Sequence, residues 1–411
     1  MSNLQRSIMK SRLPPTIPGS RIGRSDSFKK SKSRDYKPTL WSEYFVEKED
    51  VQIDEKTVFR VYRTSQPQKA GPIILLLHGG GYSALTWSHF CVEITHMIHC
   101  QCLSVDMRGH GDTITDDEED LSAETLATDI GKLISKLYPD DTPCPPIHLV
   151  GHSMGGAIAV HIAHMELIPA LVGVTVIDVV EGTAMEALAS MQSFLRSRPN
   201  FFKSIPNAIE WCIRSGQIRN IDSAKVSMPG QIINCTTKKL ATNELPLQDD
   251  PEESSETSTF THPLVISEDE EVAENAENAT SPTSSTAPPL PPSINFKKPE
   301  PLNDEANKKY TWRIDLSKSE KYWVGWFSGL SEKFLSLRVP KQLLLASIDG
   351  LDKTLTVGQM QGKFQMQVLA RCGHAVHEDR PHEVAEVISS YLIRNRFAEA
   401  AGEFRSHMPA C

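Results

Sequence analysis

The sequence GHSMGG, at residues 151–156, stands between an apolar run (residues 147–150) and a segment with the apolar spacing of a helix (residues 157–165). A G-x-S-x-G sequence between a buried strand and a helix is typical of a tight turn that presents a nucleophilic serine at the carboxyl edge of a sheet. Glycines on either side of the serine allow the strand and the helix to approach closely. The pattern therefore predicts that Ser153 is a nucleophile on such a turn.

Apolar runs and helical segments alternate on both sides of this turn. The runs at residues 73–77, 101–106 and 172–177 are short and largely apolar, which is typical of strands buried on both faces. Apolar residues recur at helical spacing over residues 121–137. This alternation predicts an α/β fold with a mostly parallel central sheet and helices on both faces. Downstream segments are expected to complete the same sheet, as strands at 342–346 and 368–369 and a helix at 384–394.

Charge is distributed unevenly along the 411 residues, whose formal net charge is −9. Residues 244–305 carry 15 Asp or Glu, two Lys and ten Pro, and residues 1–38 are rich in Ser, Arg and Lys. Both segments are poor in apolar residues, so we expect a disordered acidic insertion and a disordered basic tail. The expected domains are the tail (1–38), the first part of the α/β core (39–184), cap helices (185–243), the insertion (244–305), an aromatic cap segment (306–338) and the second part of the core (339–411).

Composition and motifs exclude several classes of protein. No apolar run approaches the roughly 20 residues that span a bilayer, and no signal peptide is recognisable, so we expect no membrane partner. No nucleic-acid recognition motif, Walker sequence or zinc-spaced ligand set is present, and we expect no nucleic-acid partner, metal or other cofactor. We expect a cytoplasmic protein. The basic cluster at residues 29–34 is a solubilising segment, a kinase target or a nuclear-import signal, and these alternatives stay open.

A glycine triplet supplies candidates for stabilising a reaction intermediate. His78-Gly79-Gly80-Gly81 follows the first buried strand directly. Acyl transfer requires hydrogen-bond donors placed in advance around the oxyanion of the tetrahedral intermediate. We expect the backbone N–H groups of Gly80 and Gly81, together with that of Met154 after the serine, to form this oxyanion hole.

The chain has 14 histidines that are candidates for the general base. His374 lies in CGH at residues 372–374, after a short strand and before the last helix, where this architecture places a base. His377 is the competitor, but the glycine before His374 favours the latter. The histidines at positions 78, 110 and 152 are expected to be structural.

Position alone leaves the acid of a catalytic triad open. Asp178 ends the strand at residues 172–177, whereas Asp349 and Asp352 follow the strand at 342–346, the commoner place for the acid in this architecture. Asp106 precedes the serine in the chain, and we expect it to be structural and to orient its turn through Arg108.

Together these motifs resemble the α/β-hydrolase superfamily, and several blocks are similar to the protein phosphatase methylesterase family. DVVEGTAM, at residues 178–185, discriminates best, because hydrolases in general share only the serine turn and the histidine loop. The other similar blocks are at residues 75–81, 151–160, 215–220, 360–367 and 372–379.

The resemblance implies an α/β-hydrolase fold and a serine carboxylesterase activity. Its substrate would be the methyl ester on the C-terminal leucine of the protein phosphatase 2A catalytic subunit, bound through its C-terminal tail and active-site face. Ser153 matches the nucleophile, His374 the base and Asp178 the acid. Residues 264–271 resemble docking peptides that bind a phosphatase regulatory subunit. The alternatives are a non-catalytic phosphatase-binding inhibitor and a small-molecule serine esterase.

Overall fold

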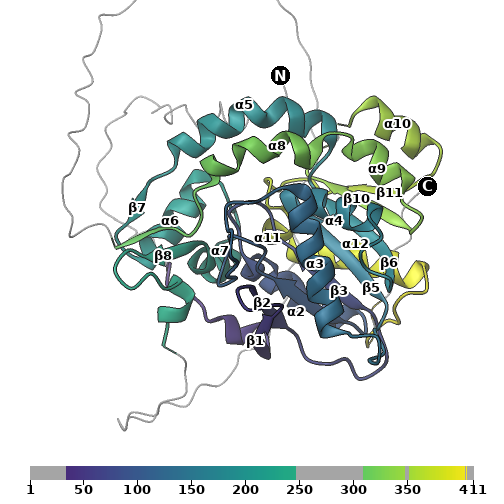
Figure 1. Cartoon of the computed structure of the whole chain (residues 1–411), viewed down its shortest axis with the longest axis horizontal. Helices are drawn as coiled ribbons and strands as arrows, with labels where there is room; N and C mark the ends of the chain where they lie inside the picture. Colours follow the sequence, from purple (N-terminus) through teal and green to yellow (C-terminus); the bar gives the residue numbers. More distant parts are fainter. Residues whose placement is uncertain (1–33, 247–308, 348–350, 403, 405–411) are drawn as a thin grey trace, which may run out of the picture. The chain divides into compact units, whose positions relative to one another are not determined.

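The central sheet has eight strands among the described residues, in the order β1-β2-β4-β3-β5-β6-β10-β11 (Figure 1). β1 and β4 each pair antiparallel with β2, and the other neighbours are parallel, so the predicted mostly parallel sheet is confirmed. The strands are β1 (Glu47–Gln52), β2 (Val58–Arg63), β3 (Ile73–Leu77), β4 (Gln101–Val105), β5 (Ile147–His152), β6 (Leu171–Ile177), β10 (Lys341–Leu345) and β11 (Gln365–Val368).

The structure, a computed structural model, describes residues 34–246, 309–347, 351–402 and 404. The predictions for most of the basic tail and the acidic insertion, including residues 264–271, therefore concern residues outside the described part of the chain.

Alternate residues of the inner strands pack into two apolar cores, one on each face of the sheet. Leu75 and Leu77 of β3 pack with α3 and α4, whereas Ile74 and Leu76 pack with α2 and α12 on the opposite face (Figure 1). Burial on both faces explains why β3 is apolar at every position. The flanking helices are α2 (Ser88–Met97), α3 (Ala123–Leu137), α4 (Met154–His164) and α12 (Pro381–Arg394). None of the described helices is long and apolar enough to cross a bilayer.

A cap lies between β6 and β10 in the chain and contains a second, three-stranded sheet as well as helices. β9, which follows the insertion, pairs antiparallel with β7 and β8, which precede it. The sequence predicted only helices before the insertion, because strands of two or three residues are too short to show alternation. Figure 1 shows α5 and α8 side by side. The cap elements are α5 (Glu181–Ser197), β7 (Phe201–Phe202), α6 (Ile205–Ser215), α7 (Ile221–Ser227), β8 (Ile232–Asn234), β9 (Tyr310–Trp312), α8 (Glu320–Phe327) and α9 (Leu330–Ser336).

Two of the predicted domain boundaries differ from the structure. The cap begins before residue 185, since α5 starts at Glu181, three residues after Asp178. The predicted start of the acidic insertion at Glu244 is also wrong. Its carboxylate accepts hydrogen bonds from Asn234 Nδ2 in β8 (3.0 Å) and from the hydroxyl of Tyr310 in β9 (2.9 Å), so it joins strands from either side of the insertion.

Glu244→Ala is expected to lower the free energy of unfolding by about 1–3 kcal/mol, because the Asn234 amide and the Tyr310 hydroxyl lose their acceptor. Urea denaturation of the full chain measures this change. Glu186→Ala, at an exposed position of α5, is the control and should stay within about 0.5 kcal/mol of wild type. Equal effects of the two substitutions would contradict the role assigned to Glu244.

Candidate active site

Ser153 lies on the tight turn between β5 and α4 that the sequence predicted. Its φ is 52°, a conformation that is uncommon for a residue with a side chain and marks a constrained turn. A Cβ on Gly151 would lie 2.2 Å from the Gly155 carbonyl oxygen, and one on Gly155 would lie 2.4 Å from the Leu77 carbonyl oxygen. Both positions therefore require glycine, because β5, α4 and β3 approach one another here through their backbones.

The structure brings Ser153, His374 and Asp178 into one chain of hydrogen bonds. The Ser153 hydroxyl lies 2.9 Å from His374 Nε2, and His374 Nδ1 lies 2.8 Å from Asp178 Oδ2. With Nδ1–H donating to the carboxylate, Nε2 is left to accept the serine proton. This arrangement has the geometry of a nucleophile, a general base and an orienting acid.

Asp178 reaches the histidine from the end of β6 rather than from the commoner position after β10. β6 and β10 are parallel neighbours, with Ile177 opposite Leu344, so both strands end at the same edge of the sheet. Asp178 has a φ of 53°, and its Oδ1 accepts a hydrogen bond from Ala346 N at 2.9 Å. Its carboxylate is thus fixed in the space beyond the end of β10.

The other acid candidates have different positions. Asp352 caps the N-terminus of α10 (Lys353–Met360), where its Oδ1 accepts from Leu355 N at 2.8 Å and its Oδ2 accepts from the Ser331 hydroxyl at 2.5 Å. Asp349 lies outside the described residues.

The loop that carries His374 is fixed by the helix that follows it, α11 (Val376–Asp379). Asp379 accepts hydrogen bonds from Gly373 N at 2.6 Å and from Arg219 N at 2.7 Å. The His374 carbonyl accepts a hydrogen bond from His152 Nε2 at 2.8 Å. Two similarity blocks that lie far apart in the sequence, residues 215–220 and 372–379, are therefore in contact and together position His374.

Only part of the predicted oxyanion hole is available in this structure. Met154 is the first residue of α4, so its N–H has no acceptor within the helix. A Cβ on Gly80 would lie 3.7 Å from Met154 Sδ, which places Gly80 beside it. The prediction that Gly81 is an oxyanion donor is wrong, because its N–H already donates a hydrogen bond to His110 Nε2 at 2.9 Å. The His110 ring accepts this bond because its Nδ1–H donates to the Arg108 carbonyl.

His78, predicted to be structural, and His377, the competitor of His374, are both hydrogen-bonded within the scaffold. His78 Nε2 accepts a hydrogen bond from Met107 N at 3.0 Å. His377 is buried 2.8 Å from the Thr86 hydroxyl, and burial lowers its pKa to about 3. Neither ring has the hydrogen bonds to a serine and an aspartate that His374 has.

Asp106 is structural, but not in the predicted way. Its carboxylate accepts hydrogen bonds from Ala84 N at 2.6 Å and from Asp112 N at 3.0 Å. Arg108 instead forms a bidentate ion pair with Asp129, at 2.7 and 2.9 Å. Asp106 therefore joins two loops through their backbones, a contact that residue spacing does not predict.

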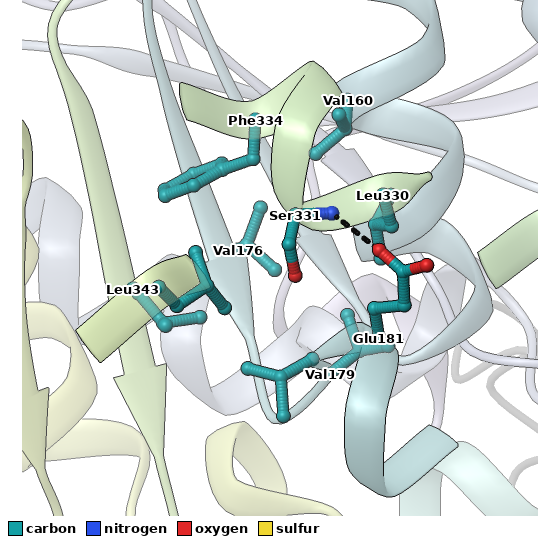
Figure 2. Close-up of a pocket in the computed structure, with 10 residues that line it drawn as sticks. Val160, Val176, Val179, Glu181, Leu330, Ser331, Phe334 and Leu343 are labelled. Atoms are coloured by element: carbon teal, nitrogen blue, oxygen red, sulfur yellow. Dashed lines mark hydrogen bonds between the residues drawn. The ribbon is translucent and has the colours of Figure 1, made fainter. Parts of the chain in front are cut away.

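Glu181, inside the discriminating block, has a role that no pattern in the sequence indicated. It lies in the crevice between α5, α9 and the sheet that Figure 2 shows, and accepts hydrogen bonds from Gly329 N (2.8 Å) and Ser331 N (3.0 Å). The carboxylate satisfies amides at the start of α9. The crevice has a volume of about 10 Å³, which leaves room for no more than one water molecule. Glu181 therefore forms a packing contact between the cap and the core.

Glu378, next to the histidine loop, makes stability depend on pH. It is buried, accepts a hydrogen bond from the Thr86 hydroxyl, and has a pKa that burial raises to about 8. Between pH 6.5 and 8 the folded protein keeps this proton and the unfolded chain does not, so this carboxyl makes the slope of the unfolding free energy against pH more negative by about 1 kcal/mol per pH unit. Glu378→Gln should remove this contribution, which urea denaturation at several pH values measures as a difference in slope from wild type.

Buried histidines such as His78 and His377, whose pKa burial lowers, contribute a slope of the opposite sign near pH 7. They are present in wild type and variant alike, so the difference between the two slopes reports on Glu378. Glu332→Gln, at an exposed position of α9, is the control and should keep the wild-type slope. A slope in Glu378→Gln equal to that of wild type would show that Glu378 does not contribute to it.

Comparison with other proteins shows which family the chain resembles. The chain matches the alpha/beta hydrolase family over residues 74–231 and 259–387. It is 51% identical to human protein phosphatase methylesterase 1, over 100% of both chains, and 49% identical to the mouse protein of that name, again over 100% of both. Identity to the Schizosaccharomyces pombe protein of that name is 34%, over 80% of this chain and 77% of the relative.

Solved structures share the fold at low identity. E-2-(acetamidomethylene)succinate hydrolase has a TM-score of 0.56 at 16% identity, over 84% of this chain and 99% of that one. The thioesterase domain from the curacin biosynthetic pathway has a TM-score of 0.51 at 16% identity, over 83% of this chain and 98% of that one. Fold, family match and full-length relatives agree, and the chain belongs to the protein phosphatase methylesterase family of α/β-hydrolase enzymes.

Proposed function

We propose that this chain removes the methyl ester from the C-terminal leucine of the protein phosphatase 2A catalytic subunit. The observation that carries the proposal is the hydrogen-bonded chain Ser153–His374–Asp178, with distances of 2.9 and 2.8 Å, in a member of this family. The names of the full-length relatives support the choice of a phosphatase methyl ester as substrate.

In the first half of the reaction, Ser153 Oγ attacks the ester carbonyl carbon while His374 Nε2 takes the hydroxyl proton. Asp178 holds the imidazole in the required tautomer and stabilises the imidazolium that forms. The N–H groups of Met154 and Gly80 are the proposed donors to the oxyanion. When the tetrahedral intermediate collapses, the C–O bond to the methoxy group breaks, and His374 returns the proton so that methanol leaves.

In the second half, water attacks the acyl-enzyme. His374 takes a proton from this water, the bond to Ser153 Oγ breaks, and the serine regains its proton. The products are the free carboxylate of the leucine and the restored enzyme.

Exposure of the site supports a substrate that is the end of a protein chain. The His374 side chain is 44% exposed, whereas that of Asp178 is 18% exposed. An accessible base allows a tail to enter without unfolding of the cap, and the phosphatase surface around the tail can then contact the protein. Binding of a regulatory subunit through residues 264–271 and a cytoplasmic location remain proposals from the sequence.

Ser153→Ala is expected to reduce demethylation of carboxymethylated phosphatase by at least about 10³-fold, because it removes the nucleophile. Binding of the phosphatase should persist, since the alanine leaves the surrounding contacts unchanged. Release of methanol and co-precipitation measure the two properties, with Ser193→Ala, exposed in α5, as control.

Unchanged demethylation, or phosphonate labelling of another serine in Ser153→Ala, would remove Ser153 from the mechanism. Methylesterase activity absent from wild type, with phosphatase binding retained, would instead favour the non-catalytic inhibitor.

Asp178→Asn is expected to reduce turnover by about 10³–10⁴-fold, because an amide favours the wrong histidine tautomer. Asp352→Asn is the matched control and should stay within about tenfold of wild type, since asparagine also caps helices well. Single-turnover kinetics and thermal unfolding should be recorded for both. An inactive Asp352→Asn beside an active Asp178→Asn would reverse the assignment.

A further inference from the structure

Arg198 is held in a defined position at the end of cap helix α5. Its guanidinium carbon lies 3.4 Å from the centre of the Trp312 ring in β9. The same indole donates a hydrogen bond from Nε1 to the Pro199 carbonyl at 2.8 Å, which fixes the backbone next to the arginine. One tryptophan therefore orients both the side chain of Arg198 and the segment that carries it.

This guanidinium borders the glycine loop of the active site. A Cβ on Gly81 would lie 3.7 Å from Arg198 Nη1, and one on Gly79 would lie 3.3 Å from Ser153 Cβ. Ser153 and Arg198 thus stand beside opposite ends of a three-glycine loop. Since one residue of extended chain spans about 3.3 Å, a few residues of peptide suffice to reach from the serine to the arginine.

The charge of Arg198 has no acidic partner among the described residues. Its Nε is covered and makes no hydrogen bond, although the residue as a whole is not fully buried. Burial lowers its pKa to about 10, so the group is still protonated at pH 7. The groups that act on it, Tyr82 and Cys212, are neutral at pH 7, because burial raises the pKa of each.

A partly desolvated cation without an anion is costly, and this chain places one beside the glycine loop, at the opposite end from Ser153. A planar guanidinium fixed by stacking is suited to bidentate binding of a carboxylate, with little side-chain entropy left to lose. Because the site is reached by the end of a peptide, the carboxylate is expected to come from that peptide.

We propose that Arg198 is the carboxylate-binding residue of the substrate site, where it binds a carboxylate of the leucine-terminated peptide. The inference rests on the proposed function, because that function makes a peptide the ligand. Two sources share the same chemistry. One is an acidic side chain a few residues before the leucine, and the other is the terminal carboxylate that hydrolysis of the ester produces.

Calorimetry on the full chain at pH 7 tests the proposal with three sets of leucine-terminated hexapeptides. One set has a C-terminal amide and a single glutamate at one of the four positions before the leucine. Another set has a free C-terminal carboxylate and glutamine at those positions. The neutral reference has the amide and glutamine. Arg198→Met removes the charge, Arg198→Lys keeps it without the planar fork, and Arg196→Met, at an exposed position of α5, is the matched control.

At least one carboxylate peptide should bind wild type and Arg196→Met about tenfold or more tightly than the neutral peptide. This preference should disappear in Arg198→Met and be reduced in Arg198→Lys, and the peptide set that shows it identifies the source. An unchanged preference in Arg198→Met, or no preference in wild type, would overturn the inference. Loss of binding to all peptides alike, with normal thermal unfolding, would assign Arg198 a general packing role instead.

Failure of the proposed function has a separate signature. A wild type that binds the peptides through Arg198 but does not demethylate the phosphatase would contradict the function and leave the carboxylate site in place.

Discussion

The backbone contact between β5, α4 and β3 is the constraint on which the rest of the site depends. Gly151 and Gly155 stand where any Cβ would be less than 2.5 Å from a backbone oxygen, so strand and helix meet at a separation that only glycine permits. That close contact forces Ser153 to a positive φ. It also directs the serine hydroxyl to His374 and leaves the Met154 amide at the free end of a helix.

The block at residues 178–185 couples this site to the cap. Asp178 binds the catalytic histidine candidate, and three residues later Glu181 binds amides at the start of α9. Between them the chain passes from the sheet into α5, which ends beside Arg198. Helix α5 therefore connects the proposed acid, before its N-terminus, with the proposed carboxylate-binding cation at its C-terminus. A movement of α5 would displace both residues.

Burial distinguishes the histidines that support the fold from the histidine that is available for proton transfer. His78, His110 and His377 are buried and bonded to backbone or hydroxyl groups, and burial lowers the pKa of each. They hold the glycine loop and neighbouring loops as neutral rings. His374 differs because its side chain is 44% exposed and lies between a hydroxyl and a carboxylate. The same residue type thus supports the scaffold at these buried positions and is available for proton transfer at position 374.

The sequence by itself determined the parallel sheet, the serine turn and the histidine loop, because each depends on residues close together in the chain whose backbone needs are local. It did not determine which strand supplies the proposed acid, since the Asp178 carboxylate at the end of β6 is held by the backbone that follows the neighbouring β10. Tertiary structure alone decided that Gly81 binds His110, that Glu244 joins β8 to β9 and that Arg198 stacks on Trp312. These contacts join residues between 10 and 114 positions apart, and the spacing of residue types carries no information about such pairings until the chain has folded.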